Sequence, residues 1–312
     1  ANIVTYLPID TKRHAKKFLD IVNPELTVFV KYDVWPNFLN ELKNRKGRAI
    51  LISASFRKNQ TYFKFYGKPL REALFTFEHI FTQNIETQKL LQTIHYNTTT
   101  VTGDTRFDRV YSQLKLDNTL DFIADFKDKK LCVVAGSTWT DGEALLVNYI
   151  NKSTKDIKFI IAPHSIKENR LQDLQKKLQT TSILFSEKTG ASLKKFQVFI
   201  IDTIGILTKI YSYADISYVG CAMGHTGLHN TLEPAVFGIP IIIGNNHSKF
   251  PEAKVLIEHG GMFSISNQLE FDNILKKLIE DEQLRVSVGK KNATYIKNNK
   301  GVVDKICDYL HL

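Results

Sequence analysis

The chain alternates short apolar runs with amphipathic helical patterns along most of its length, and this alternation limits the folds open to it. Runs of strand length, such as LTVFVKY and GRAILISAS, are separated by segments with helical spacing. Within residues 11–22, for example, Ala15, Phe18, Leu19 and Val22 fall on one helical face. Strands that alternate with helices form parallel sheets with right-handed crossovers. The sequence therefore predicts an α/β protein.

The predicted elements fall into two series. The first has the strands NIVTYLP, LTVFVKY, GRAILISAS, HIFTQN and TTTVTG, with helices over residues 11–22, from Pro36 and over residues 85–93. The second follows the polar segment DFKDKK and has the strands LCVVAG, IKFIIAP, QVFIID, ISYVG and IPIIIG, with helices from about residues 141, 166 and 206. We expect two Rossmann-like domains, at residues 1–127 and 128–312.

The end of the chain reads as helical. Two apolar stripes with helical spacing carry this prediction, and they consist of Leu269, Ile274, Leu275, Leu278 and Ile279, and of Val302, Val303, Ile306 and Leu310.

Composition narrows the partners and the compartment. The formal net charge is +10, from 42 Lys and Arg against 32 Asp and Glu, which favours anionic partners: nucleic acids, anionic lipid surfaces or phosphorylated small molecules. Three cysteines without a CxxC pattern argue against a disulfide framework or a structural zinc site. No run reaches the ~20 apolar residues of a membrane-spanning helix. Because the chain begins at Ala1 within an apparent strand, we expect a fragment.

Ligands of doubly wound domains bind at the carboxyl ends of the strands, and polar residues follow three strands of the second series. Gly136, Ser137 and Thr138 end the first of these strands, where backbone N–H groups and hydroxyls can face an anion or simply cap a helix. His164 follows the next strand, and taken alone it reads as a structural loop residue. Asp202 and Thr203 follow the third, with Gly205 opening the next helix. One ligand across this edge could touch all three segments.

The segment GHTGLHNTLEPAVFGIPIIIG, residues 224–244, combines glycines, histidines and a glutamate with a buried strand. His225 and His229 have the spacing of a zinc-binding helix face, but the flanking glycines indicate a loop, so we expect no metal. A glycine-rich loop over residues 220–227, including Gly224, allows the backbone to approach a phosphate. Glu233, near the end of a short predicted helix, can accept both hydroxyls of a ribose. The segment is predicted to hold a nucleotide.

Several motifs in order along the chain resemble those of the Kdo transferases, which attach 3-deoxy-D-manno-octulosonic acid (Kdo) to lipid A precursor in Gram-negative bacteria. GLHNTLEPAVFGIPIIIG resembles the family's C-terminal signature, and YDVWPNFLNELKNR resembles its acidic-x-acidic-hydrophobic-WPN segment. LISASF, VTGDTRFD, VAGST and DTIG resemble its following strand, its VTGNxKFD motif, its GST turn and its DTxGE loop. The matches span about residues 30–251.

The resemblance implies a GT-B glycosyltransferase that needs no metal or other cofactor and transfers Kdo with inversion from CMP-Kdo to the bisphosphorylated acceptor lipid IVA. It places Arg106 at the motif lysine that stabilises the departing phosphate, and Asp33 at one acidic position before WPN. It also implies a set of residues that contact CMP. These are Pro163, His164, Ile204, Gly205, Ile206, Asn230, Thr231, Leu232 and Glu233.

The chain departs from the family pattern at three places. Lys31 stands at the first acidic position, Ile206 at the DTxGE glutamate, and the arginine beside His164 is absent. The resemblance further implies that the family's membrane anchor, first strand and general-base glutamate lie upstream of Ala1. We therefore expect an incomplete N-terminal domain, and a chain that binds CMP or CMP-Kdo weakly and turns over little.

The resemblance also gives the positive charge a role, since a cationic N-terminal half suits an anionic lipid surface. It implies a place at the cytoplasmic face of the bacterial inner membrane and no nucleic-acid partner. Two alternatives stay open. One is another GT-B sugar-nucleotide enzyme, such as a UDP-sugar transferase or epimerase. The other is a non-catalytic protein that binds nucleotides or nucleic acids.

Overall fold

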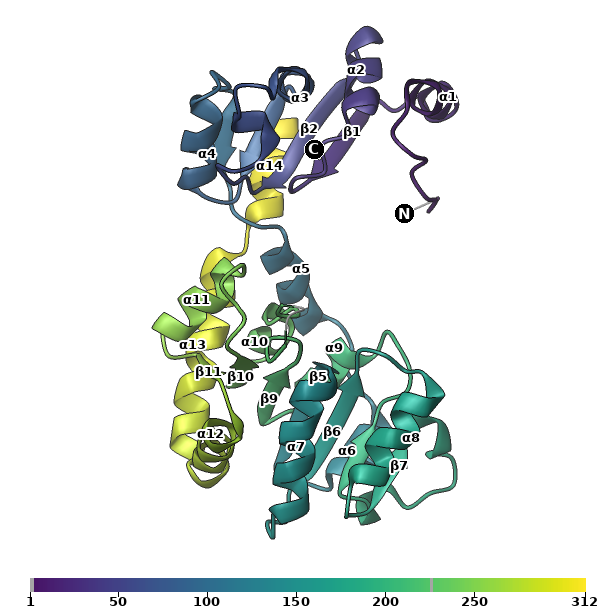
Figure 1. Ribbon diagram of the computed structural model, residues 1–312, viewed down its shortest axis with the longest axis vertical. Helices are drawn as coiled ribbons and strands as arrows, with labels where there is room; N and C mark the ends of the chain where they lie inside the picture. The colour runs from purple at the N-terminus through teal and green to yellow at the C-terminus, as the bar shows by residue number, and fades with distance from the viewer. Residues whose placement is uncertain (1–2, 225–226) are drawn as a thin grey trace. The chain divides into compact units, whose positions relative to one another are not determined.

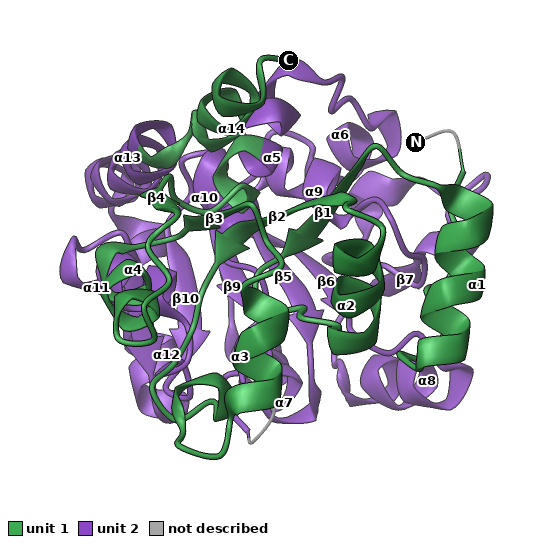
Figure 2. Cartoon of the chain, turned by 90° about the horizontal axis from the view of Figure 1, so that it is seen from above, with its two compact units in different colours: residues 1–108, 299–312 green, residues 109–298 purple. Residues whose placement is uncertain are grey.

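A computed structural model describes residues 3–224 and 227–312. The chain divides into two compact units (Figure 2): residues 1–108 together with 299–312, and residues 109–298. The sequence placed the boundary at residues 127 and 128 and assigned the C-terminal tail to the second domain. The observed division differs at both points, for reasons given below.

The first unit contains a four-stranded parallel sheet of order β1-β2-β3-β4. Its strands are β1 Leu26–Val30, β2 Arg48–Ala54, β3 His79–Thr82 and β4 Thr99–Val101. The predicted strands at these four places are confirmed. The helices before the division are α1 Lys12–Val22, α2 Pro36–Asn44, α3 Lys68–Leu74 and α4 Ile85–Gln92, and α5 Arg106–Ser112 crosses from the first unit into the second (Figure 1). α1 to α4 pack on one face of the sheet through Leu19, Leu39, Leu74 and Leu91.

Local sequence sets where the first two helices begin. The Thr11 side chain accepts a hydrogen bond from the N–H of His14 and caps α1. α2 begins at Pro36, which suits the first helical position because that position has no hydrogen bond to lose. The Asp10 carboxylate accepts the N–H groups of Asn37 and Phe38, each at 3.1 Å, and completes that helix end.

The predicted strand NIVTYLP is wrong over its described residues, which form no strand. Ile3, Val4 and Tyr6 are 85%, 88% and 97% exposed. An alternating apolar pattern makes a strand only where a neighbouring strand supplies hydrogen bonds. Among the described residues β1 pairs with β2 alone, and residues 3–9 pair with no strand.

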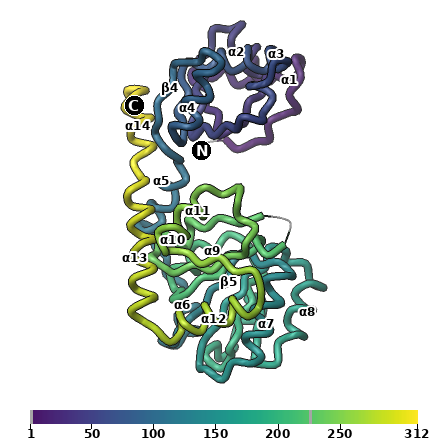
Figure 3. The backbone as a smooth tube through the Cα atoms, turned by 60° about the vertical axis from the view of Figure 1, so that its left-hand side comes forward, coloured from purple at the N-terminus to yellow at the C-terminus, as the bar shows by residue number. Residues whose placement is uncertain are grey.

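The C-terminal helix α14, Val302–Leu310, belongs to the first unit and explains the observed division. Val302 and Ile306 pack with Ile50 and Phe81, on the face of the first sheet that α1 to α4 leave uncovered. The Asp108 carboxylate accepts N–H groups from the first turn of α14. In the tube of Figure 3 the yellow end of the chain accordingly lies beside β4. The sequence predicted this helix but not its packing partner.

The second unit contains a seven-stranded parallel sheet of order β11-β10-β9-β5-β6-β8-β7. Its strands are β5 Cys132–Thr138, β6 Lys158–Pro163, β7 Ser182–Leu184, β8 Val198–Ile200, β9 Ile216–Val219, β10 Ile241–Gly244 and β11 Met262–Ile265. Five of these were predicted, whereas β7 and β11 were not. Its helices are α6 Asp121–Lys127, α7 Thr140–Lys152, α8 Glu168–Lys177, α9 Leu207–Ile210, α10 Leu232–Val236, α11 Pro251–Glu258, α12 Gln268–Glu280 and α13 Glu282–Asn299.

Side chains alternate between the two faces of this sheet as the strand period requires. On β5, Val133 and Ala135 join a core with α7, α8 and α12, whereas Cys132 and Val134 join a core with α6 and α9. The strands are therefore buried on both faces, which explains their nearly continuous apolar sequences.

The predicted helical tail is confirmed, although its stripes are not buried throughout. Leu275 and Leu278 are buried, whereas Leu269 is 70% exposed and Val303 is 42% exposed. Short 3-10 helices complete the chain at η1 Thr61–Phe63, η2 Gln113–Lys115, η3 Phe185–Glu187, η4 Leu193–Lys195 and η5 Tyr211–Tyr213. Among the described residues, no helix has the length and apolar character needed to cross a membrane.

Candidate functional site

The strand order of the second sheet points to the end of β5. Strands β6, β8 and β7 lie on one side of β5, and β9, β10 and β11 lie on the other. The order therefore reverses at β5, and ligands of open α/β sheets bind at the carboxyl ends of strands beside such a switch point. The segments singled out in the sequence after β5, β6 and β9 all begin at this edge.

The ends of β5 and β9 approach each other closely. The N–H of Gly220 donates to the carbonyl of Gly136 at 3.0 Å. A Cβ atom at Gly220 would lie 2.2 Å from the carbonyl oxygen of Ser137, so only glycine fits there. Ser137 has φ +52° and lies at a break in the β5–β6 register. The strand thus leaves its regular course at the turn that the sequence marked for ligand binding.

Three aromatic rings stack at this edge. The rings of Trp139 and His164 are 4.9 Å apart between centroids and inclined by 21°. His229, from the segment after β9, lies 4.8 Å from His164, and its Nε2 is 3.4 Å from Trp139 Nε1. The N–H of His164 donates to the Thr138 carbonyl at 2.9 Å. Trp139 keeps 38% of its surface exposed, so the stack has an accessible aromatic face.

Burial and, secondarily, the charge of His164 lower the pKa of His229. The ring is therefore neutral at pH 7, which lets its Nε2 accept from the indole N–H of Trp139. Two positively charged imidazoles would repel each other in this stack. His229 consequently contributes an uncharged ring to the stack near neutral pH.

Glu233 lies close to the same turn. The Nδ2 group of Asn230 donates to Glu233 Oε1 at 3.0 Å, and Asn230 Oδ1 accepts the N–H of Leu232 at 3.2 Å. Burial and then the Glu233 charge raise the pKa of Tyr211. A Cβ at Gly136 would lie 1.9 Å from the Tyr211 hydroxyl oxygen. Tyr211 therefore lies against the end of β5, with the half-buried Glu233 carboxylate near enough to influence it.

The segment after β8 is held by contacts at both ends and is exposed in the middle. Asp202 Oδ1 accepts the N–H of Ser186 at 3.0 Å, so this carboxylate already fixes a neighbouring loop. Ile204 is 81% exposed, and Gly205 has φ +92° with open space around it. Ile206 packs against the core that contains Tyr211. The exposed part of the loop, Ile204 and Gly205, is thus the part open to a ligand.

The remaining candidate residues of the second unit frame the edge. Thr203 is half-buried beside Asp202, Pro163 ends β6 and is buried, and Thr231 and Leu232 are buried at the start of α10. A Cβ at Gly224 would lie 2.6 Å from Asp141 Oδ2, so the α7 carboxylate approaches this loop. His225 lies outside the described residues. No cluster of three metal-ligating side chains occurs among the residues that are described.

Two candidate residues lie in the first unit. Arg106 Nε donates to Asp104 Oδ2 at 2.8 Å, and the same oxygen accepts from Gln83 Nε2 at 2.9 Å. Asp104 is 5% exposed, so the arginine is held on a buried carboxylate. Asp33 is exposed in the turn between β1 and α2, and its charge contributes, after burial, to raising the pKa of Tyr62. Lys31, in the same turn, has φ +59°.

Comparison with known proteins finds similarity to Kdo transferases. The family model described as 3-deoxy-D-manno-octulosonic-acid transferase (kdotransferase) matches residues 1–109. The 3-deoxy-D-manno-octulosonic acid transferase of Haemophilus influenzae is 24% identical over 323 residues, which cover 98% of this chain and 73% of that protein. A bifunctional glycosyltransferase/methyltransferase of Fusobacterium nucleatum is 26% identical over 291 residues, 90% of this chain, and the alignment covers 44% of the relative's length. The chain is thus similar to Kdo transferases over nearly its whole length, and its first third matches the model of that family.

The fold is shared with a sugar-nucleotide enzyme of known structure. The UDP-GlcNAc 2-epimerase from Neisseria meningitidis bound to UDP-GlcNAc superposes with a TM-score of 0.63 at 14% identity, over 94% of this chain and 80% of the epimerase. At that identity the likeness concerns the fold alone. The predicted GT-B architecture, with parallel sheets in both parts, is confirmed.

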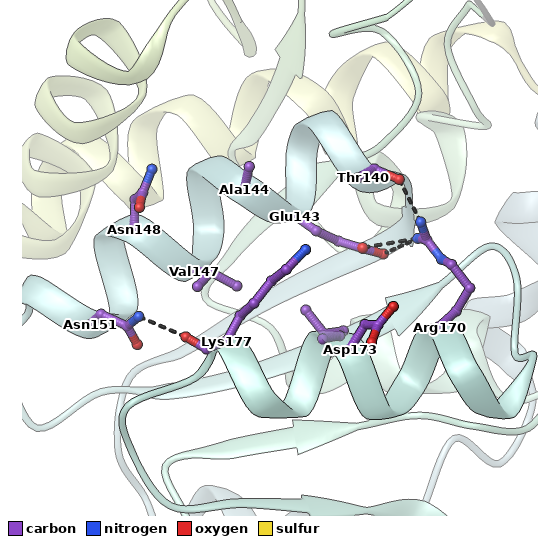
Figure 4. Close-up of a pocket in the computed structure, with 10 residues that line it drawn as sticks. Thr140, Glu143, Ala144, Val147, Asn148, Asn151, Arg170, Asp173 and Lys177 are labelled. Atoms are coloured by element: carbon purple, nitrogen blue, oxygen red, sulfur yellow. Dashed lines mark hydrogen bonds and ion pairs between the residues drawn. The ribbon is translucent and has the colours of Figure 1, made fainter.

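Sequence reasoning missed an ion-pair network behind the turn at the end of β5. Thr138 Oγ1 donates to Glu143 Oε1 at 3.0 Å, and Arg170 on α8 pairs with Glu143 on α7 at 3.0 Å. Figure 4 shows Arg170 also reaching Thr140, at one end of a hollow of about 440 Å³ between α7 and α8. The hydroxyl of Thr138 is therefore engaged within the protein. The pairing depends on two neighbouring helices, which no local motif reveals.

The aromatic stack was also missed in part. His164 was singled out only as a loop residue or by resemblance, His229 only as a rejected metal ligand, and Trp139 not at all. A tryptophan immediately after a buried strand, at the edge where ligands bind, was the available signal.

Proposed function

We propose that this chain is a glycosyltransferase of the Kdo transferase family that transfers Kdo from CMP-Kdo to the lipid A precursor lipid IVA in lipopolysaccharide biosynthesis. The reaction proceeds with inversion at the anomeric carbon and without a metal. One observation carries the proposal: Trp139, His164, His229 and Glu233 converge at the switch point of the second sheet.

Each part of a cytidine nucleotide has a matching group at this edge. The base stacks on the exposed aromatic face beside His164, and Glu233, held by Asn230, accepts the ribose hydroxyls. We place the phosphate beside the turn at Gly136 and Ser137 and the loop at Gly224, where glycine leaves room for it. Ile204 and Gly205 close the ligand from the segment after β8.

Several candidate residues act by supporting this surface. Thr138 fixes the turn through Glu143, and Asp202 fixes its own loop through Ser186. A second set belongs to the scaffold under the ligand, through backbone contacts or packing. This set consists of Pro163, Thr203, Ile206, Thr231 and Leu232.

In the proposed reaction Arg106 stabilises the negative charge that develops on the departing CMP phosphate. A guanidinium held in place by Asp104 needs no reorganisation when that charge appears. Asp33 is proposed to shape the acceptor side of the active site. The expected readout for both residues is a lower kcat with little change in CMP affinity.

The partners follow from charge and chemistry. The excess of ten positive charges suits the phosphates of lipid IVA and an anionic membrane surface, and it requires no nucleic acid. The proposed place of action is the cytoplasmic face of the bacterial inner membrane.

Transfer of radiolabelled Kdo from CMP-Kdo to lipid IVA, with EDTA present, tests the reaction. Thermal-shift measurements with CMP, UDP and GDP test the donor, with CMP expected to stabilise most. Glu233→Gln should weaken CMP binding about tenfold, the loss of one charge-assisted hydrogen bond, whereas the exposed Glu258→Gln on α11 should not. A clear preference for UDP would instead support a UDP-sugar transferase or epimerase.

A further inference from the structure

One loop of the first unit exposes two neighbouring aromatic rings. Phe65 is 92% exposed and Tyr66 is 61% exposed, and the two rings pack edge to face with centroids 5.1 Å apart. Large apolar side chains exposed side by side mark interaction surfaces, whereas scattered single ones do not. We refer to residues 57–68, RKNQTYFKFYGK, as the aromatic loop.

The backbone of the aromatic loop is fixed. Arg71 Nη1 donates to the carbonyls of Lys64 at 2.8 Å and Tyr62 at 3.3 Å. A Cβ at Gly67 would lie 1.8 Å from the Thr61 carbonyl oxygen, so the loop closes on itself only because residue 67 is glycine. The two exposed rings are therefore held outward by a defined structure.

The aromatic loop separates its packed rings from its exposed ones. Tyr62 and Phe63 pack edge to face with each other and with Phe56, which is 7% exposed. These three rings join the core under α1 to α4. Phe65 and Tyr66 are absent from that core. The packing of this core therefore does not require these two side chains.

Basic residues lie on both sides of Phe65 and Tyr66 in the sequence. The aromatic loop contains Arg57, Lys58, Lys64 and Lys68 and no Asp or Glu. None of the ion pairs between described residues involves these four side chains. A loop that carries four cations outside ion pairs together with two exposed aromatic rings is complementary to a surface that is anionic outside and apolar beneath.

We propose that the aromatic loop docks on anionic phospholipid bilayers, with Phe65 and Tyr66 entering the headgroup region and the flanking lysines contacting lipid phosphates. Aromatic rings favour this interfacial depth, and basic residues add affinity for anionic lipid. A nucleic acid fits less well, because successive bases need open ring faces and these two rings pack against each other at 86°. The proposal rests on the proposed function, which includes an anionic membrane partner, and it assigns the contact with that partner to the aromatic loop.

Vesicle flotation without substrates tests this, using phosphatidylcholine vesicles with and without about 30% phosphatidylglycerol. We expect binding to the anionic vesicles only. Since each cation near the surface contributes roughly fivefold in affinity, the triple variant Lys58→Gln, Lys64→Gln, Lys68→Gln should bind at least tenfold more weakly. The charge-matched control is Lys176→Gln, Lys276→Gln, Lys297→Gln, which should retain binding.

The apolar part of the proposal needs its own variant. Phe65→Ser with Tyr66→Ser should also lower binding at least tenfold, whereas the exposed Leu269→Ser and Val286→Ser on α12 and α13 should not. Unchanged melting temperatures and CMP affinity separate this result from misfolding and from failure of the proposed function. Equal binding by the loop variants and their controls, no binding by the unaltered chain, or tighter binding to single-stranded RNA than to vesicles would overturn the proposal.

Discussion

The ion pair between Arg170 and Glu143 allows a quantitative test of the structure that supports the turn at the end of β5. The side chain of Glu143 is 9% exposed and that of Arg170 is 31% exposed. Arg170→Met keeps the aliphatic stem but leaves the buried Glu143 carboxylate with the Thr138 hydroxyl as its one remaining side-chain partner among the described residues. Breaking a fully buried pair costs about 3–5 kcal/mol, and the partial exposure of Arg170 reduces this to about 2–3 kcal/mol.

Urea unfolding of the chain, followed by far-UV circular dichroism, measures this loss. With a slope of about 2–3 kcal/mol per M, the midpoint of the second unit should fall by about 1 M. The matched control is Lys254→Met, which removes the exposed pair with Glu258 and should cost less than about 0.5 kcal/mol.

The double variant with Glu143→Gln decides whether the pair itself is responsible. Because Glu143→Gln removes the unpaired charge, adding it to Arg170→Met should restore part of the lost stability. A loss below about 1 kcal/mol for Arg170→Met, or strictly additive effects in the double variant, would refute the reasoning. Arg170→Met should also weaken CMP binding. Arg170 holds Glu143, Glu143 holds Thr138, and Thr138 directly precedes Trp139 of the aromatic stack.

Three further perturbations test other parts of the structure. Asp108→Ala removes the acceptor for the N–H groups at the start of α14 and should cost about 1–2 kcal/mol, seen as faster hydrogen exchange in α14; unchanged exchange there would contradict the assigned role. Gly220→Ala forces the backbone of β9 away from Ser137 and should cost about 1–3 kcal/mol and abolish CMP binding, and retained binding would show that the close approach is dispensable. Because the pKa of His229 is lowered in the folded chain, folding favours its neutral form, so stability falls as pH drops below about 6.5; melting temperatures at pH 7.5 and 5.5 should show a smaller drop for His229→Gln, and an identical drop would contradict this.

Much of the fold could be predicted because buried parallel strands leave a direct trace in sequence. The runs IKFIIAP and IPIIIG are apolar because both faces of the sheet are covered. The polar residues that come directly after such runs indicate the carboxyl edge of the sheet, where ligands of this kind of fold bind. The strands β7 and β11 were missed because they form the two edges of the sheet, where their partly exposed residues leave no continuous apolar run in the sequence.

The errors arose where tertiary contacts decide the outcome. Residues 3–9 alternate like a strand, but no described strand pairs with them. α14 has an ordinary amphipathic sequence, and only Asp108 and Phe81, far away in the chain, reveal its place. Trp139 and Arg170 likewise gain their roles from neighbours on other elements. The family resemblance directed attention to the carboxyl edge of the second sheet, and the roles of the residues there are proposals.

The central claim is that CMP binds at the carboxyl end of β5. Its most direct test uses the two tryptophans of the chain, Trp35 in the first unit and Trp139, which immediately follows β5. Their indole N–H signals can be resolved by NMR and assigned with Trp139→Phe. Titration with CMP should shift the Trp139 signal in a saturable manner, with the Trp35 signal as internal reference and Glu233→Gln requiring about tenfold more CMP. A Trp139 signal that stays in place at saturating CMP would contradict the account.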